Sequence, residues 1–285
     1  MSPATASVLP AALRLGAVHL DVADLVRAVA WYERSLGLRV HEQGDTTATL
    51  GDGDEPLLLL HEDREAQPPG RTAGLYHYAL LYPSRDELAR AALRLTASQT
   101  QIQGASDHET HEAIYLADAD GNGIELAADR PRSAWPEHLG YASGPRPLDF
   151  EGLMATVAGE QPTPWAAKGL RVGHLHLHVG DIEAGLRFYR DTVGFEVQAN
   201  LGSAAFVSAG GYHHHLGFNV SNGVGAQAPP PHSVGLHAWS VWLDEDEAAR
   251  LRARLEAAGH AVRDVPGGFV VRDPWQTALL VAVSS

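Results

Sequence analysis

Cysteine is absent from the 285-residue chain. Its absence excludes disulfide bonds and metal sites built from thiolates, and it fits a protein of the reducing cytosol. The chain also lacks any run approaching about 20 apolar residues, and its start, MSPATASVLPAALRLG, has neither the charged head nor the long apolar stretch of a signal peptide. We therefore expect a cytoplasmic protein that does not insert into a membrane.

Positive charge is scarce. Against 35 Asp and Glu stand 21 Lys and Arg, which gives a formal net charge of -14. Because proteins bind nucleic acid by neutralising phosphates with cations, a nucleic-acid partner is not expected. Hydrophobic residues make up 45% of the chain, enough for a substantial core, and histidine is abundant at 16 residues. The positions of those histidines are therefore the first place to look for chemistry.

The sequence contains a repeat. Residues 16–40 (GAVHLDVADLVRAVAWYERSLGLRV) and 173–197 (GHLHLHVGDIEAGLRFYRDTVGFEV) match without a gap at an offset of 157. Each copy begins with the alternation typical of a strand. Asp24 and Asp181 then occupy a helix N-cap position, and a glycine ends each amphipathic helix. Each copy is thus predicted to be a strand followed by a helix.

A second and weaker pair of segments has the same order. Residues 74–95 and 236–255 each read as a strand, a cap and an amphipathic helix, at an offset near 160. Short β-like runs divided by Gly, Asp and Pro follow every helix. The chain is therefore predicted to be an α+β protein of four βαβββ modules, over residues 14–62, 74–128, 171–220 and 233–283.

The modules fall into two halves of the chain. Residues 10–128 are expected to form one domain of two modules, and residues 169–284 a second domain of two modules. Between them, residues 129–168 are rich in Pro, Gly and Trp and are interpreted as a linker. A linker of about forty residues is long enough to reach across a domain, so modules from different halves can meet.

The strand–Asp–helix–Tyr–Gly pattern and the phrase DADGNGIEL (118–126) resemble the vicinal-oxygen-chelate superfamily of glyoxalase I, bleomycin-resistance proteins and extradiol dioxygenases. The resemblance covers nearly the whole chain. It implies modules paired into two half-open barrels, with a metal held by residues of the first and last strands. The last-strand ligand would be Glu125.

Three local matches resemble the extradiol branch, closest to the catechol 2,3-dioxygenases. The phrase YHHHLGFN (212–219) is similar to the strand that carries the acid–base histidine, a place taken here by His214. Tyr115, ten residues before Glu125, takes the place of a substrate-facing tyrosine, and His108 in GASDHETH that of a second pocket histidine. The resemblance implies Fe(II), with Mn(II) or another divalent metal left open, and a small aromatic diol and O2 as substrates.

The ligand set depends on which modules pair. In the family the first-strand ligand lies seven residues before the capping Asp, which gives His174 in the third module but Ala17 in the first. Pairing the second module with the third completes a set of His77, His174 and Glu125. Two imidazoles and one carboxylate on one face leave open positions, as non-haem Fe(II) oxygenases need, so we prefer this crossed pairing. A site of the third and fourth modules, with His237 as a ligand, stays open.

Strand alternation makes a separate prediction about the three consecutive histidines. It places His214 on the face opposite to His213 and His215, so that only one of these faces meets the substrate.

Two other functions stay open at this stage. A glyoxalase-type isomerase or lyase would resemble a four-ligand site with a second Glu, which residues 213–215 do not supply. A non-catalytic small-molecule-binding protein of the same fold would need an apolar pocket without a metal triad. Assembly into a homo-oligomer also stays open.

Overall fold

The computed structural model describes residues 9–136, 141 and 144–284. Four βαβββ modules follow one another within them. The first consists of β1 (Arg14–Val22), α1 (Leu25–Leu36), β2 (Arg39–Gln43), β3 (Thr47–Gly51) and β4 (Pro56–Glu62). The second consists of β5 (Gly74–Tyr82), α2 (Arg85–Ala97), β6 (Ile102–Asp107), β7 (His111–Ala117) and β8 (Gly123–Asp129).

The second half of the chain repeats the plan. The third module consists of β10 (Arg171–His178), α4 (Ile182–Leu186), the π-helical turn η3 (Arg187–Val193), β11 (Glu196–Asn200), β12 (Ala204–Ser208) and β13 (Leu216–Asn219). The fourth consists of β14 (Gly235–Leu243), α5 (Glu245–Ala257), β15 (Arg263–Val265), β16 (Gly268–Arg272) and β17 (Ala278–Val283). The connecting segment adds η1 (Arg132–Ala134), β9 (Arg146–Pro147) and α3 (Phe150–Ala155). The predicted fold class is confirmed.

The strands form two sheets, and each sheet joins one module from either half of the chain. The nine-stranded sheet has the order β11-β12-β13-β10-β5-β8-β7-β6-β9 and unites the third module with the second. The eight-stranded sheet has the order β15-β16-β17-β14-β1-β4-β3-β2 and unites the fourth with the first. The crossed pairing predicted from the ligand set is therefore confirmed. The division into residues 10–128, 129–168 and 169–284 describes sequence halves, and neither half closes a sheet alone.

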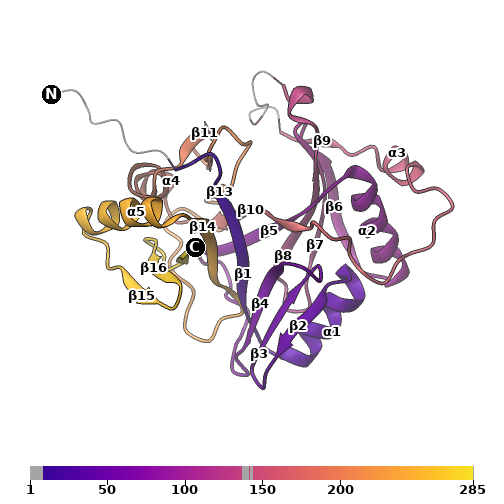
Figure 1. The fold of residues 1–285 in the computed structure, drawn as a ribbon, viewed down its shortest axis with the longest axis horizontal. Helices are drawn as coiled ribbons and strands as arrows, with labels where there is room; N and C mark the ends of the chain where they lie inside the picture. Colours follow the sequence, from indigo (N-terminus) through magenta and orange to yellow (C-terminus); the bar gives the residue numbers. More distant parts are fainter. Residues whose placement is uncertain (1–8, 137–140, 142–143, 285) are drawn as a thin grey trace.

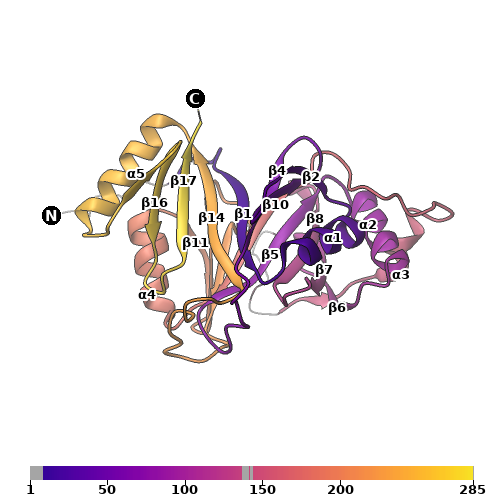
Figure 2. The same ribbon diagram turned by 90° about the horizontal axis from the view of Figure 1, so that it is seen from below.

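Helices cover the outside, and the central strands meet between them. Figures 1 and 2 show α1 and α2 on one side of the molecule and α4 and α5 on the other, with β1, β14, β5 and β10 in the middle. One continuous cluster of buried side chains includes residues of all four modules, such as Leu20, Leu80, Leu177 and Val241. The two sheets therefore share one core. No helix of the described chain is long and apolar enough to cross a membrane.

The repeated sequence signals have the local structure expected of them. Asp24 caps α1 by accepting a hydrogen bond from the backbone N–H of Arg27, and Asp181 caps α4 in the same way. Gly37 ends α1 at a φ of 70°, and Gly194 ends η3 at a φ of 100°. Because a side chain is strained at such positive φ values, glycine suits both positions.

Two buried tyrosine–aspartate hydrogen bonds tie the sheets together. The hydroxyl of Tyr32 on α1 donates to Asp118, at 2.6 Å, and that of Tyr189 on η3 donates to Asp273, at 2.8 Å. Each bond joins modules that are neighbours in sequence but belong to different sheets. The repeated tyrosine is thus a structural residue that holds one sheet against the other.

Candidate metal centre

Three predicted ligands meet on the central strands of the nine-stranded sheet. His77 lies on β5, Glu125 on the neighbouring β8, and His174 on β10 at the other side of β5. The strand register places Glu125 and His174 opposite the same residue, Ala79. His77, two residues before Ala79, points to the same face of the sheet. The backbone therefore brings all three side chains to one place.

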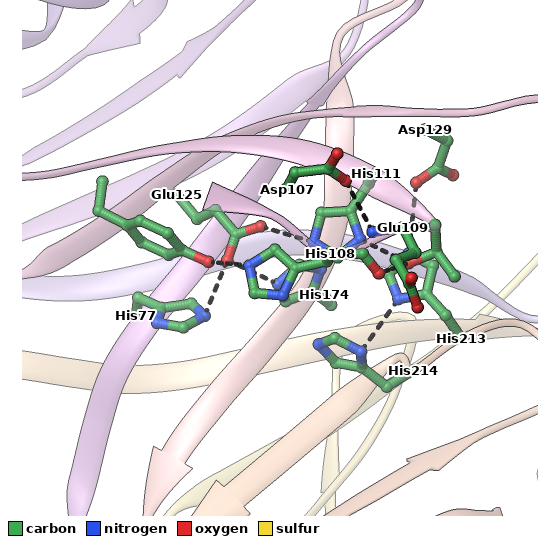
Figure 3. Close-up of polar contacts among 12 residues, drawn as sticks. His77, Asp107, His108, Glu109, His111, Glu125, Asp129, His174, His213 and His214 are labelled. Carbon is green, nitrogen blue, oxygen red and sulfur yellow. Dashed lines mark hydrogen bonds and ion pairs between the residues drawn. The ribbon is translucent and has the colours of Figure 1, made fainter. Parts of the chain in front are cut away.

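Their donor atoms converge. The Nε2 atoms of His77 and His174 each lie 3.2 Å from Oε2 of Glu125, and the two imidazole rings are inclined at 72° (Figure 3). All three side chains are buried, with Glu125 only 1% exposed. When two donor atoms each lie about 2.1 Å from one ion and the donor–ion–donor angle is a right angle, the donors are about 3 Å apart. The observed separations therefore suit a single metal ion.

An orphaned atom supports the same interpretation. Nε2 of His77 is buried and makes no hydrogen bond, because its direction toward Glu125 does not meet hydrogen-bond geometry despite the short distance. A buried polar atom without a partner costs free energy, and a metal ion would satisfy it. The residues present therefore fit a divalent metal.

The carboxylate of Glu125 is ionised although it is buried. Burial alone would raise the pKa of this group, but His174, His111 and His77 together hold its pKa well below the usual range. Burial also lowers the pKa of the His174 imidazole. An ionised Glu125 beside a neutral His174 is the protonation state that metal ligation requires of these two residues.

His111 is a site residue that sequence reasoning missed. Its Nε2 lies 3.1 Å from the other carboxylate oxygen of Glu125, and its Nδ1 lies 2.9 Å from the hydroxyl of Thr110. His111 begins β7 four residues before Tyr115, and side chains separated by an even number share a face of a strand. That spacing was a signal available in the sequence.

A cavity of about 360 Å³ opens beside the triad. Its lining includes all three predicted catalytic residues, His108, Tyr115 and His214. The Nε2 atom of His108 lies 2.7 Å from the hydroxyl of Tyr115. Burial, followed by His111, lowers the pKa of His108 to about 4, while burial and then Glu125 raise the pKa of Tyr115. At neutral pH both groups are therefore uncharged.

The connecting segment also reaches the cavity, which the sequence did not predict. Tyr141, Gly144 and Pro145 are among the lining residues, and the Tyr141 hydroxyl donates a hydrogen bond to the carbonyl of His213. β9 pairs with β6 at the edge of the nine-stranded sheet. The segment interpreted as a linker thus forms part of the cavity wall.

The alternation predicted for the three consecutive histidines is wrong. Both His213 and His214 line the cavity, because residues 213–215 precede β13 and have no regular strand backbone. His215 is turned elsewhere, and its Nδ1 accepts a hydrogen bond from the backbone N–H of Ala209 at 3.1 Å. The ring centroid of His214 lies 4.2 Å from that of His174.

A second group, His111, Asp129 and His213, also brings potential ligand atoms within 4.8 Å of one another. Its geometry does not suit one ion. The rings of His111 and His213 are stacked at 4.5 Å and lie within 14° of parallel. The nitrogen lone pairs lie in the ring planes. In two stacked rings they therefore lie in nearly parallel planes and do not point at one common ion. This group is therefore not interpreted as a metal centre, and within it His213 is hydrogen-bonded to Asp129 and stacked on His111.

His237 does not belong to the site. It lies on β14 of the eight-stranded sheet, so it cannot complete a ligand set with His174, and that alternative is wrong. β5 and β14 both begin at a glycine, Gly74 and Gly235, so the counterpart of His77 is Ala238. His237 instead is half-exposed and lies 3.1 Å from Asp21.

Comparison with known proteins identifies the family of the chain. A model of the Glyoxalase/Bleomycin resistance protein/Dioxygenase superfamily matches residues 14–126 and 171–277. A relative described as Catechol-2,3-dioxygenase, from Bacillus subtilis (strain 168), is 38% identical over 277 residues, which are 94% of this chain and 96% of the relative. Glutathione transferase FosA from Serratia marcescens is 28% identical over 118 residues, which are 39% of this chain and 78% of that protein.

Solved structures share the fold. Glyoxalase I from Zea mays superimposes with a TM-score of 0.57 at 15% sequence identity, over 95% of this chain and 92% of that one. At this identity the likeness concerns the arrangement of modules alone.

Proposed function

Because the chain belongs to the Glyoxalase/Bleomycin resistance protein/Dioxygenase superfamily, we propose that it is a metal-dependent extradiol ring-cleavage dioxygenase that acts on a catechol-type substrate with O2. One observation carries the proposal. Two imidazoles and a single carboxylate converge on one face of a sheet, beside a cavity lined by His214. Such a face leaves open positions for substrate and O2.

The proposed ligands are His77, His174 and Glu125, and the proposed metal is Fe(II), with another divalent metal open. When bound, the metal would supply the redox centre and lower the pKa of a catechol hydroxyl. The chain's own contribution is to hold three donors in place in a buried environment, where electrostatic interactions are strong.

Three further residues handle protons and orientation in this proposal. His214 accepts a proton from the catechol and later returns it, the work for which a neutral imidazole is suited. Tyr115 is protonated and donates a hydrogen bond to a substrate oxygen, and His108 fixes the direction of the Tyr115 hydroxyl from 2.7 Å.

The number of carboxylates in the cavity favours a dioxygenase over an isomerase of glyoxalase I type. A site of the glyoxalase I type would need a second Glu ligand. Among the described residues that line the cavity, the two carboxylates are Glu125 and Glu109. Glu109 is held in an ion pair with Arg146 at 2.5 Å and is not among the described residues whose ligand atoms converge. One carboxylate is therefore available to a metal.

The charge of the cavity narrows the substrate. No Lys or Arg is among the described residues that line the cavity. A carboxylate on the catechol ring would find no free cation among these lining residues, because Arg146, next to the lining residue Pro145, is already paired with Glu109. We therefore propose catechols with uncharged ring substituents as substrates.

The test is an oxygen-uptake assay with protein loaded anaerobically with ferrous iron. We expect O2 consumption with catechol and 4-methylcatechol, accompanied by the absorbance of a ring-opened semialdehyde, and much slower turnover of 3,4-dihydroxybenzoate. Iron-loaded protein that consumes no O2 with any catechol would contradict the dioxygenase proposal. Faster turnover of the carboxylated catechol would contradict the substrate class alone.

A further inference from the structure

A chain of hydrogen bonds leads from a buried carboxylate to His214. Asp129 ends β8, four residues after Glu125, and its Oδ1 lies 3.3 Å from Nε2 of His213. The Nδ1 atom of His213 lies 3.0 Å from Nδ1 of His214. Figure 3 shows this order, with Asp129, His213 and His214 following one another along the edge of the site.

The donors and acceptors in this chain can be assigned in only one way. An ionised carboxylate can only accept, so Nε2 of His213 carries a hydrogen. A neutral imidazole has one N–H, so Nδ1 of His213 carries a lone pair and accepts from Nδ1–H of His214. His214, neutral in turn, is left with its lone pair on Nε2.

The surroundings support these protonation states. Burial would raise the pKa of Asp129, but the hydrogen bond from His213 keeps that pKa below its usual value. Burial lowers the pKa of His213 to about 3. The carboxylate is thus ionised and His213, the middle ring of the chain, is neutral near pH 7.

The middle ring of the chain is held in place. His213 is only 2% exposed and lies between the rings of His111, at 4.5 Å, and Tyr212, at 4.1 Å. The hydroxyl of Tyr212 donates to Oδ2 of Asp129 at 2.9 Å, which fixes the other carboxylate oxygen. Neither Asp129 nor His213 can turn without losing several contacts.

We propose that Asp129 is a positioning residue that acts through His213 to hold His214 in the tautomer whose Nε2 can take the proton from a catechol hydroxyl. The inference rests on the proposed function for the role of that proton. Asp129 itself does not touch the substrate, since it is absent from the lining of the cavity as the structure describes it.

The first test measures tautomers directly. Protein labelled with ¹⁵N-histidine and loaded with zinc, which is diamagnetic, reports by two-dimensional NMR which nitrogen of His214 carries the hydrogen, with His214→Phe used for assignment. We expect Nδ1–H in the wild type. In Asp129→Asn, the amide can donate to Nε2 of His213, which would reverse the chain and move the hydrogen of His214 to Nε2.

The second test separates positioning from folding. Asp129→Asn should keep its metal and its KM for catechol, while kcat falls by roughly 10²-fold or more, because the base is in the wrong tautomer. Tyr212→Phe is the matched control. It removes a hydrogen bond to the same carboxylate but leaves the chain intact, so kcat should change by about threefold at most.

Each outcome decides the inference. An unchanged His214 tautomer in Asp129→Asn, or an equal loss of kcat in Tyr212→Phe, would overturn it. If Asp129→Asn does not fold, His213→Phe keeps the stacked ring, removes both nitrogens and should show the same fall in kcat with metal retained. Because the tautomer is read without turnover, a protein that proves inactive on catechols would refute the proposed function and still test the hydrogen-bond chain.

Discussion

The two sheets have the same topology, yet only one carries a candidate metal centre in the part of the chain that the structure describes. β10 and β5 lie at the centre of one sheet, and β1 and β14 at the centre of the other. Equivalent positions follow from the strand registers, in which Ala79 pairs with Glu125 and Ser240 with Leu280. In the eight-stranded sheet, Ala17 corresponds to His174, Ala238 to His77 and Leu280 to Glu125.

The difference shows that the backbone alone does not make the site. Two alanines and a leucine offer no metal-binding atom at the same three positions. Ala238 instead packs with Val270 and Ala278 in a small apolar cluster, while Leu280 is partly buried on β17. The candidate metal centre therefore lies in one sheet, and the other sheet packs against it through the shared core.

The largest effect should come from removing the carboxylate. Glu125→Ala should lose its metal and its ring-cleavage activity to background while keeping the fold, since only two of the three proposed ligands and no anionic one remain. Iron content, oxygen uptake and circular dichroism would measure the three properties.

Leu280→Ala is the matched variant in the other sheet. It should keep full metal content and activity and lose about 2 kcal/mol of unfolding free energy, measured by urea denaturation. Activity that survives in Glu125→Ala, or metal lost from Leu280→Ala, would contradict the assignment of the metal centre to the nine-stranded sheet.

The next effect concerns proton transfer. His214→Phe should retain iron and still bind catechol, with turnover lower by roughly 10² to 10⁴. His215→Phe should have a turnover close to that of the wild type, because His215 lies outside the cavity lining and hydrogen-bonds Ala209. The reverse pattern, measured by steady-state kinetics with iron content checked for each variant, would mean that His215 meets the substrate.

The smallest effect concerns a histidine of the sheet without the centre. Burial, followed by His61 and His237, lowers the pKa of His19 to about 4. The unfolded chain, with an ordinary pKa near 6.5, binds the proton first as pH falls. The contribution of His19 to stability is therefore present above about pH 6.5 and is lost as pH falls toward 4.

His19→Gln should make the fall in unfolding free energy between pH 6.5 and 4 shallower, without changing metal content at pH 7. Urea denaturation across this range would measure it. An unchanged slope would show that His19 is not buried in the folded protein as the structure describes.

Much of the fold could be predicted from the sequence, because the repeated segments keep the residues that begin and end their helices. The gapless repeat placed Asp24 and Asp181 at helix N-caps, where the structure has them. The requirement for a complete ligand set led to the crossed pairing of modules, which the sheet order confirms. The positions of His77, Glu125 and His174 followed from that pairing.

Other features depend on single residues between elements. Ser84 caps α2 two residues after β5 ends, whereas Asp244 caps α5 directly after β14. Aligning the two helices therefore matched His237 to His77. When the strands themselves are aligned, the residue that corresponds to His77 is Ala238. A shift of one residue turns every side chain to the other face of a strand.

The cavity wall could not be predicted for a related reason. His213 and His214 share the cavity because the backbone before β13 is irregular, and no alternation describes such a segment. Tyr141 reaches the site from a connecting segment whose path depends on tertiary packing.

The most direct test of the account is the number of ferrous ions bound per chain. Anaerobic equilibrium dialysis of the wild type, His77→Ala and His237→Ala compares the two sheets in one measurement. We expect close to one ion for the wild type and for His237→Ala, and almost none for His77→Ala. Two equally tight sites in the wild type, or loss of the ion from His237→Ala but not from His77→Ala, would contradict the assignment of a single metal centre to the nine-stranded sheet.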